Sequence, residues 1–113
     1  MSAPDDRGIA ALIWCPFPDG ESARQVAGAL IDEKLVACAN ILPGMLSLFS
    51  WNGRREEADE AGVLFKTNAG VLDEAIARLT QLHPYDEPAI LGWRCDAAAP
   101  GTLAWLAALG ARP

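Results

Sequence analysis

Two short stretches of the chain carry side chains that could bind a metal ion. The only histidine, His83, is followed by Asp86 and Glu87, and Cys15 stands directly before Pro16. A thiolate and an imidazole together suit copper or zinc, and carboxylate oxygens can complete a ligand shell. These residue types indicate Cys15 and His83 as candidate metal ligands, with Asp86 and Glu87 as additional oxygen ligands.

Each candidate also has a purely structural interpretation. His83 falls at the predicted C-terminus of a helix, where an imidazolium suits the helix dipole. Cys15 can be a small buried hydrophobic residue, which is the common fate of a free cysteine. The carboxylates of Asp86, Glu87 and Glu60 can simply be solvated. The sequence leaves both interpretations open.

Signals for catalysis are few. A Cys–His pair needs a third group that orients the base, and the spacing identifies none. Neither phosphate-binding pattern, G-x-x-x-x-G-K or G-x-G-x-x-G, is present. Trp51, Tyr85 and Trp93 could line a small-molecule cleft, although packing in a core or interface also accounts for them. We predict a protein that is not an enzyme.

A long hairpin, residues 35–67, is the element around which the others are arranged. Asn52-Gly53 near its middle is typical of a type I′ turn. With a tight turn, Ile41 faces Leu64 and Pro43 faces Gly62. Proline cannot donate to the ladder and glycine weakens a strand, so we expect a bulge there, which would shift the register by one residue.

The first arm of this hairpin is too long for its own domain. Its 17 residues, 35–51, span roughly 55 Å when extended, whereas a domain of this length has a radius of gyration of roughly 13 Å. We therefore expect the tip to project, and its apolar residues Met45, Leu48, Phe49 and Trp51 to be covered by another subunit. The alternative is a sharp fold-back at residues 43–44, which would give two shorter strands.

The remaining elements complete a βαββαβ order. The pattern predicts a buried strand over 9–15, a helix capped by Asp19, a second helix capped by Asn68 and ended by Pro84, a strand over 89–93 and a final helix capped by Thr102. This order is typical of an α+β, ferredoxin-like antiparallel sheet with two helices on one face, here with a C-terminal helix added. The other face needs a partner surface. We place the first and fourth strands beside different central strands, which leaves the meeting of Cys15 and His83 open.

Composition excludes several classes of protein. The chain of 113 residues fits a single domain, residues 1–113, with residues 1–7 flexible. A net charge of −6 without a basic cluster argues against nucleic-acid binding, and no apolar run is long enough for a membrane span. The acidic start does not resemble a signal peptide. Three cysteines without a C-x-x-C pattern argue against disulfides and structural zinc, and favour a cytoplasmic location.

Taken together, the motifs resemble the CutA divalent-cation tolerance family. They lie in the family's order over nearly the whole chain: Cys15 to the Pro18-Asp19 turn, LVACANILPG at 35–44, SLFSWNG at 47–53, Glu60 with VLFKT at 63–67, HPYDEP at 83–88 and AWL at 104–106. The resemblance implies a ferredoxin-like subunit in a tight homotrimer whose hairpins extend onto neighbours. It also implies a cytoplasmic protein of copper tolerance that binds copper or another divalent cation through Cys15 and His83.

The chain departs from the family pattern at four positions. Leu82 stands where some bacterial members have another histidine, and Phe49 replaces the usual tyrosine. Ala89 and Thr102 replace a usual glutamate and a usual tyrosine. These departures leave the fold and the trimer intact but leave the metal site open. Two alternatives remain: a PII-like trimer that senses a ligand, although the basic residues and phosphate-binding loop of that class are missing, and a structural trimer without a ligand.

Overall fold

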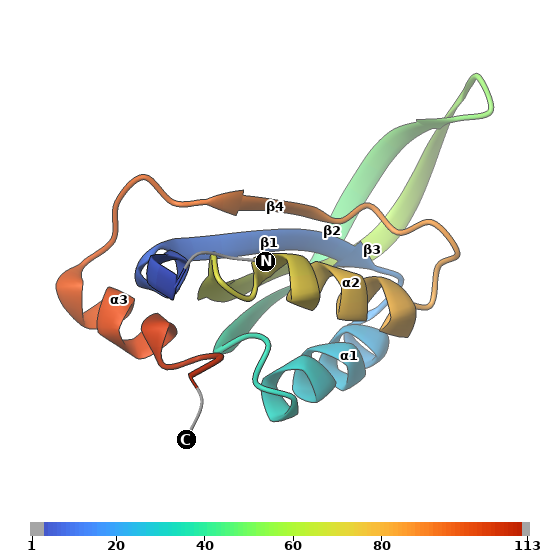
Figure 1. Ribbon diagram of the computed structural model, residues 1–113. Helices are drawn as coiled ribbons and strands as arrows, with labels where there is room; N and C mark the ends of the chain where they lie inside the picture. The colour runs from blue at the N-terminus through green and yellow to red at the C-terminus, as the bar shows by residue number, and fades with distance from the viewer. Residues whose placement is uncertain (1–3, 112–113) are drawn as a thin grey trace.

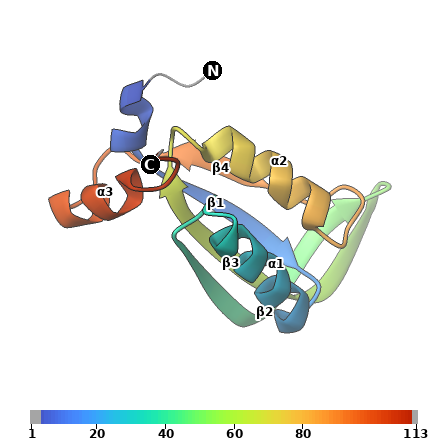
Figure 2. The same cartoon turned by 60° about the horizontal axis from the view of Figure 1, so that its bottom comes forward.

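The computed structural model describes residues 4–111 and has the predicted α+β, ferredoxin-like fold (Figure 1). A 3₁₀ helix, Pro4–Gly8, precedes four strands and three helices. They are β1 (Ala10–Phe17), α1 (Gly20–Asp32), β2 (Cys38–Trp51), β3 (Arg54–Asn68), α2 (Leu72–Leu82), β4 (Leu91–Arg94) and α3 (Pro100–Ala107). The strands form one antiparallel sheet in the order β2-β3-β1-β4. Helices α1 and α2 cover one face of it (Figure 2).

The position of β1 corrects the predicted neighbours. β1 is a central strand that pairs with both β3 and β4, so the first and fourth strands lie side by side. It also continues past the predicted end and includes Pro16. β4 begins opposite Trp14 and does not reach Pro16, so Pro16 has a neighbouring strand on one side only, a position where a strand tolerates proline. β1 therefore delivers Cys15 and Pro16 to the edge of the sheet where the hairpin leaves it.

The turn of the hairpin is the predicted one. Asn52 and Gly53 both have positive φ, 52° and 74°, as a type I′ turn requires. β2 is one strand of 14 residues, so the fold-back alternative is wrong. The hairpin extends beyond the helices (Figure 1), and the molecule measures 46 Å along its longest axis against 26 Å along the others.

A bulge interrupts the hairpin near Pro43, as predicted. The register shifts between Leu42 and Met45, where Gly44 has a φ of 68°. Toward the tip the pairing is that of a tight turn, whereas on the other side Ile41 faces Val63 rather than Leu64. The bulge thus carries β2 from the body of the sheet into the projecting arm without a break in the strand.

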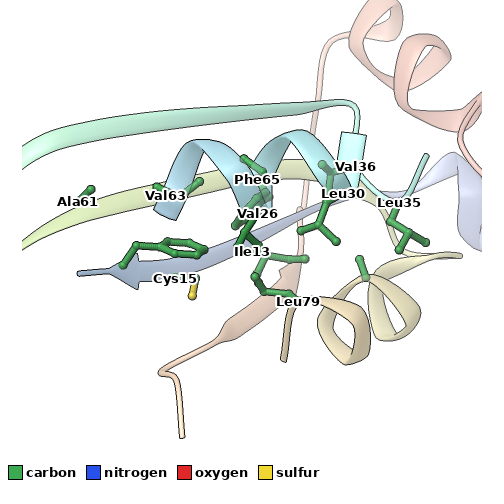
Figure 3. Packing of buried hydrophobic residues seen from close by; sticks show 14 residues of the cluster. Ile13, Cys15, Val26, Leu30, Leu35, Val36, Ala61, Val63, Phe65 and Leu79 are labelled. Carbon is green, nitrogen blue, oxygen red and sulfur yellow. The ribbon is translucent and has the colours of Figure 1, made fainter. Parts of the chain in front are cut away.

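The hydrophobic core lies between the sheet and the two covering helices (Figure 3). Its largest fully buried side chains are Phe17, Phe65, Ile13, Leu30 and Leu79. Alternate residues of β1 and β3 supply it, as expected for a sheet with one covered face. Burial of these groups is the dominant favourable term that holds α1 and α2 on the sheet.

The predicted N-cap residue is confirmed for α1 and wrong for α2. The Asp19 carboxylate accepts a hydrogen bond from the Ser22 amide at 2.8 Å, as an N-cap does. Asn68, by contrast, ends β3, and α2 has Val71 at its N-cap. The Asn68 amide group is fully buried and donates to the carbonyls of Leu106 and Leu109. Its Oδ1 accepts from the amides of Gly70 and Val71 in the turn before α2, so Asn68 fixes this turn locally and also ties it to α3.

The last helix and the N-terminal segment also differ from expectation. α3 begins with Pro100 at its first turn and has Ala99 rather than Thr102 at its N-cap. Of the segment predicted to be flexible, residues 1–3 lie outside the described residues, and Pro4–Gly8 form a 3₁₀ helix. The Arg94 guanidinium donates to the Asp6 carboxylate at 3.1 Å. Within residues 4–111, no helix is long and apolar enough to span a membrane.

The sheet face opposite α1 and α2, called here the open face, is largely apolar. The register places Leu12, Trp14, Leu64, Leu91 and Trp93 on it. Leu91 and Trp93 are exposed. No helix of the part of the chain that the structure describes covers this face, so the prediction that it is left uncovered is confirmed.

Candidate functional site

The candidate ligands Cys15 and His83 meet at one corner of the molecule, where β1 and α2 both end. α2 stops at Leu82 because Pro84 disfavours helical backbone in the residue before it. His83 is the C-cap and has extended backbone, so its side chain turns back toward β1. There it contacts the carbonyl of Pro16 at 2.9 Å, and the Cys15 thiol donates to the same carbonyl at 3.5 Å. The structure thus brings the two candidate ligands together within one chain.

Both ring nitrogens of His83 have hydrogen-bond partners. Nδ1 accepts from the Tyr85 amide at 3.1 Å, so Nδ1 carries no proton. The contact of Nε2 with the Pro16 carbonyl is then a donated bond from Nε2–H. The ring also stacks on Phe17, with 4.3 Å between centroids. This arrangement fixes the neutral Nε2–H tautomer and leaves no free lone pair on the ring.

Burial favours the same neutral form. His83 is 7% exposed, and burial lowers its pKa below the ordinary 6.5, against smaller opposing effects of the Pro16 carbonyl and Glu60. An imidazolium would also lose the bond from the Tyr85 amide, because a protonated Nδ1 cannot accept. The predicted role of His83 as a charged helix terminus therefore does not describe this corner.

The thiol of Cys15 is held in its protonated form. Cys15 is fully buried in the core (Figure 3). Burial, and to a smaller extent the negative charge of Glu60, raises its pKa to about 12. The thiolate is the form of cysteine that binds metals. Of the two interpretations drawn from the sequence, the small buried hydrophobic residue describes Cys15 in this arrangement.

A tyrosine–glutamate pair borders the corner, and sequence spacing gave no signal for the pairing. The Tyr85 hydroxyl donates to the Glu60 carboxylate at 2.9 Å, across 25 positions of sequence. Burial, followed by this hydrogen bond, raises the pKa of Tyr85 to about 12. Through its amide on His83 and its hydroxyl on Glu60, Tyr85 joins the loop after α2 to β3.

The donor set of this chain does not fit a copper ion as arranged. Asp86 and Glu87 are exposed and have no bond to the corner. Among residues 4–111, no three His, Cys, Asp or Glu side chains gather closely enough to hold a metal. Both ring nitrogens of His83 are engaged in hydrogen bonds, and the Cys15 sulfur carries a proton. Ligation would require the His83 ring to give up the Tyr85 amide or the Pro16 carbonyl.

An open cleft of about 1090 Å³ lies beside the corner, between the hairpin and the loop after α2. Trp51, Phe49 and Leu48 border it on the hairpin side, and Tyr85 on the loop side. Three carboxylates line it as well: Glu60, Asp86 and Glu87. Asp86 and Glu87, predicted as oxygen ligands, thus belong to the cleft. Of the four predicted interface residues, Leu48, Phe49 and Trp51 are exposed and Met45 is partly buried.

Comparison with known proteins gives a consistent result. Residues 11–108 match the family model described as CutA1 divalent ion tolerance protein. The divalent-cation tolerance protein CutA of Pyrococcus horikoshii is 38% identical over 95 residues, which cover 84% of this chain and 92% of that protein. The crystal structure of CutA from Xylella fastidiosa is similar with a TM-score of 0.82 and 37% identity, covering 86% of this chain and 93% of that one. A structure described as the periplasmic divalent cation tolerance protein CutA from Archaeoglobus fulgidus has a TM-score of 0.81 and 30% identity, covering 86% and 94%.

Proposed function

Because this chain belongs to the CutA1 divalent ion tolerance protein family, we propose that it serves in tolerance of divalent cations as a homotrimer. In this proposal it acts by binding and not as an enzyme. The observation that carries the proposal is the amount of apolar surface that the chain leaves uncovered. Leu46, Leu48 and Trp51 on the projecting hairpin are each 57–58% exposed.

Two separate surfaces call for a partner. The hairpin carries exposed apolar side chains on both of its faces, because Leu46 and Leu48 alternate with Phe49 and Trp51 along β2. The open face adds Leu91 and Trp93, and β2 and β4 are both edge strands of the sheet. Apolar strands with open edges invite association. A copy of the same chain offers the matching surfaces, and three copies is the assembly that the resemblance to CutA implies.

The mass in solution tests the assembly. Size exclusion coupled to light scattering should give three times 12.0 kDa at all concentrations. A monomer whose mass does not change with concentration would contradict the proposal, because the apolar hairpin would then be stable in water. A dimer would contradict the number of subunits.

The cation proposed from the sequence is copper, with Cys15 and His83 as ligands and Asp86 and Glu87 as oxygen ligands. Since both soft donors are capped in this arrangement, we expect copper to bind weakly. The chain lacks a second histidine at Leu82, so no further imidazole can compensate. Binding should weaken further as the pH falls through the titration of His83, because a metal ligand must be deprotonated.

Calorimetric titration with copper at neutral pH tests these ligands. If they are right, Cys15→Ser and His83→Ala should each weaken binding at least about tenfold, or about 1.4 kcal/mol. Cys38→Ser is the matched control, because Cys38 lies in β2 and its thiol contacts Asn40. Unchanged affinity in both variants would place the ligands elsewhere. Absence of binding by the wild-type protein would mean that the chain keeps the family fold without a copper site.

We further propose a cytoplasmic location, on the ground that Cys15, Cys38 and Cys95 are all free thiols. The description of the Archaeoglobus fulgidus protein as periplasmic makes this a point to measure. Cell fractionation followed by immunoblotting should find the protein in the cytoplasmic fraction. Recovery with periplasmic markers would overturn the location.

A further inference from the structure

We propose that Asn52 is a site of spontaneous covalent modification, at which the Gly53 backbone nitrogen closes an imide ring and the side-chain nitrogen of Asn52 leaves as ammonia. The two residues form the turn at the tip of the hairpin, with φ values of 52° and 74°. Both reacting groups belong to this turn, and the only other reactant is water. The reaction therefore does not require a free apolar surface on the hairpin.

The reaction balances with water alone. The Gly53 nitrogen bonds to the side-chain carbonyl carbon of Asn52, and its proton leaves with the departing amide nitrogen as ammonia. Water then opens the ring at one of its two carbonyl carbons. Opening at the side-chain carbonyl gives aspartate, whereas opening at the main-chain carbonyl gives isoaspartate, in which the backbone runs through the former side chain. Either product carries a negative charge that asparagine lacks.

The conformation of the turn already supplies part of the geometry that ring closure needs. In a type I′ turn the first central residue has left-handed backbone, with ψ of about +30° to +60°, and the next nitrogen then lies opposite Cβ across the Cα–C bond. Ring closure needs this nitrogen on the same side as Cβ. That is its place in a type II′ turn, where the first central residue has φ of about +60° and ψ of about −120°. The φ of Asn52, 52°, suits both turns, so only ψ must change.

A flip of the Asn52–Gly53 peptide plane converts one turn into the other, and this sequence permits it. The second central residue changes from positive to negative φ, and glycine adopts both signs without a steric penalty. Both turns match the twist of the flanking strands, so the Trp51–Arg54 pair that ends the ladder stays formed. Gly53 also has no side chain that could hinder its nitrogen. The folded tip thus reaches the reactive geometry without separation of the strands.

The other two asparagines of the chain lack these features. Asn40 lies within β2 and is followed by Ile41, whose branched side chain hinders the attacking nitrogen. Asn68 is fully buried, and its side chain bonds the carbonyls of Leu106 and Leu109 and the amides of the turn before α2. Both residues therefore serve as internal controls.

Peptide mapping of the aged protein tests the proposal. The purified protein is kept at 37 °C and about pH 8, sampled over weeks and digested with trypsin at mildly acidic pH. Cleavage after Lys34 and Arg54 gives one peptide that contains both Asn40 and Asn52. We expect aspartate and isoaspartate to form at Asn52 at least about tenfold faster than at Asn40, where the branched neighbour hinders attack, and Asn68 to stay unchanged.

Asn52→Gly is the matched variant. A Gly-Gly pair also forms a type I′ turn, but it has no side-chain amide to lose. Ion exchange should therefore separate a more acidic species from aged wild-type protein and not from aged Asn52→Gly. Light scattering at each time point verifies that the mass of the native sample is unchanged during the incubation.

Three outcomes would overturn the proposal. Equal rates at Asn40 and Asn52 would mean that the turn and Gly53 give the reaction no advantage. Absence of modification at Asn52 in the native sample, or its appearance only in urea, would mean that the folded turn prevents the flip. An acidic species that forms equally in Asn52→Gly would assign the new charge to another residue.

Discussion

Replacement of His83 by alanine should destabilise the protein even when no metal is present. The ring makes two hydrogen bonds, to the Pro16 carbonyl at 2.9 Å and from the Tyr85 amide at 3.1 Å. Each contributes roughly 0.5–1.5 kcal/mol net, and the stacking on Phe17 adds roughly 0.5–1.5 kcal/mol. We therefore expect His83→Ala to lower the free energy of unfolding by about 2–4 kcal/mol.

Urea denaturation at pH 7.5 and a fixed protein concentration measures this loss. His83→Asn is the graded control, because its side-chain oxygen can take the place of Nδ1 and accept from the Tyr85 amide while the bond to Pro16 is lost. It should cost less than alanine. Hydrogen exchange gives a local readout, since the Tyr85 amide should exchange faster in His83→Ala than in His83→Asn.

A loss below about 0.5 kcal/mol in His83→Ala, without faster exchange at Tyr85, would refute this reasoning. The hydrogen bonds would then contribute nothing to the folded state, and the ring would be free to serve as a ligand. A large loss would mean that His83 holds the loop after α2 against β1 in the absence of any metal.

Three further results are expected. Gly62→Ala should lower the free energy of unfolding by about 1–3 kcal/mol in thermal or urea denaturation, because its Cβ would lie 2.4 Å from the Trp14 ring. Gly28→Ala, inside α1 with no atom within 4 Å of its Cβ, should instead stabilise the protein by about 0.5–1 kcal/mol. Equal effects of the two substitutions would contradict the packing described for Gly62. Trp51→Ala should cost roughly 3–5 kcal/mol per site and reduce the mass if a neighbour buries this ring; unchanged mass and melting temperature would mean that Trp51 remains as exposed as in the single chain. Stability should be constant between about pH 6.5 and 8 and fall below pH 6.5, because burial lowers the pKa of His83 and the unfolded chain then takes up a proton more readily than the folded one. A slope that persists between pH 7 and 5 in His83→Asn would assign it to another group.

The parts of the fold that were predictable from sequence depend on local chemistry. Asn52-Gly53 specifies its turn because both residues tolerate positive φ. The bulge was indicated by Pro43, which cannot donate to the ladder, and by Gly62 on the facing strand. The Asp19 cap needs only the amide of Ser22, three residues away. Each signal lies within a few residues of the feature that it specifies.

The parts that sequence reasoning missed depend on distant contacts. Asparagine is a residue type that often caps helices. β3 carries Asn68 into the interior, where its side-chain amide donates to carbonyls 38 and 41 residues away. Tyr85 meets Glu60 only because the fold brings the loop after α2 beside β3, across 25 positions of sequence. The candidate residues at the corner were predictable from sequence. The protonation states of Cys15 and His83 were not, because they depend on burial and on hydrogen bonds to a backbone carbonyl, which no sequence motif indicates.

That carbonyl, of Pro16, governs how the corner can respond to a cation. It accepts hydrogen bonds from both Cys15 and His83, so each candidate ligand is turned away from the cleft toward the same atom. With a thiol pKa of about 12, some five units above neutral pH, forming the Cys15 thiolate at pH 7 costs on the order of 7 kcal/mol. Copper–thiolate bonding must exceed that cost and also displace a hydrogen bond at His83.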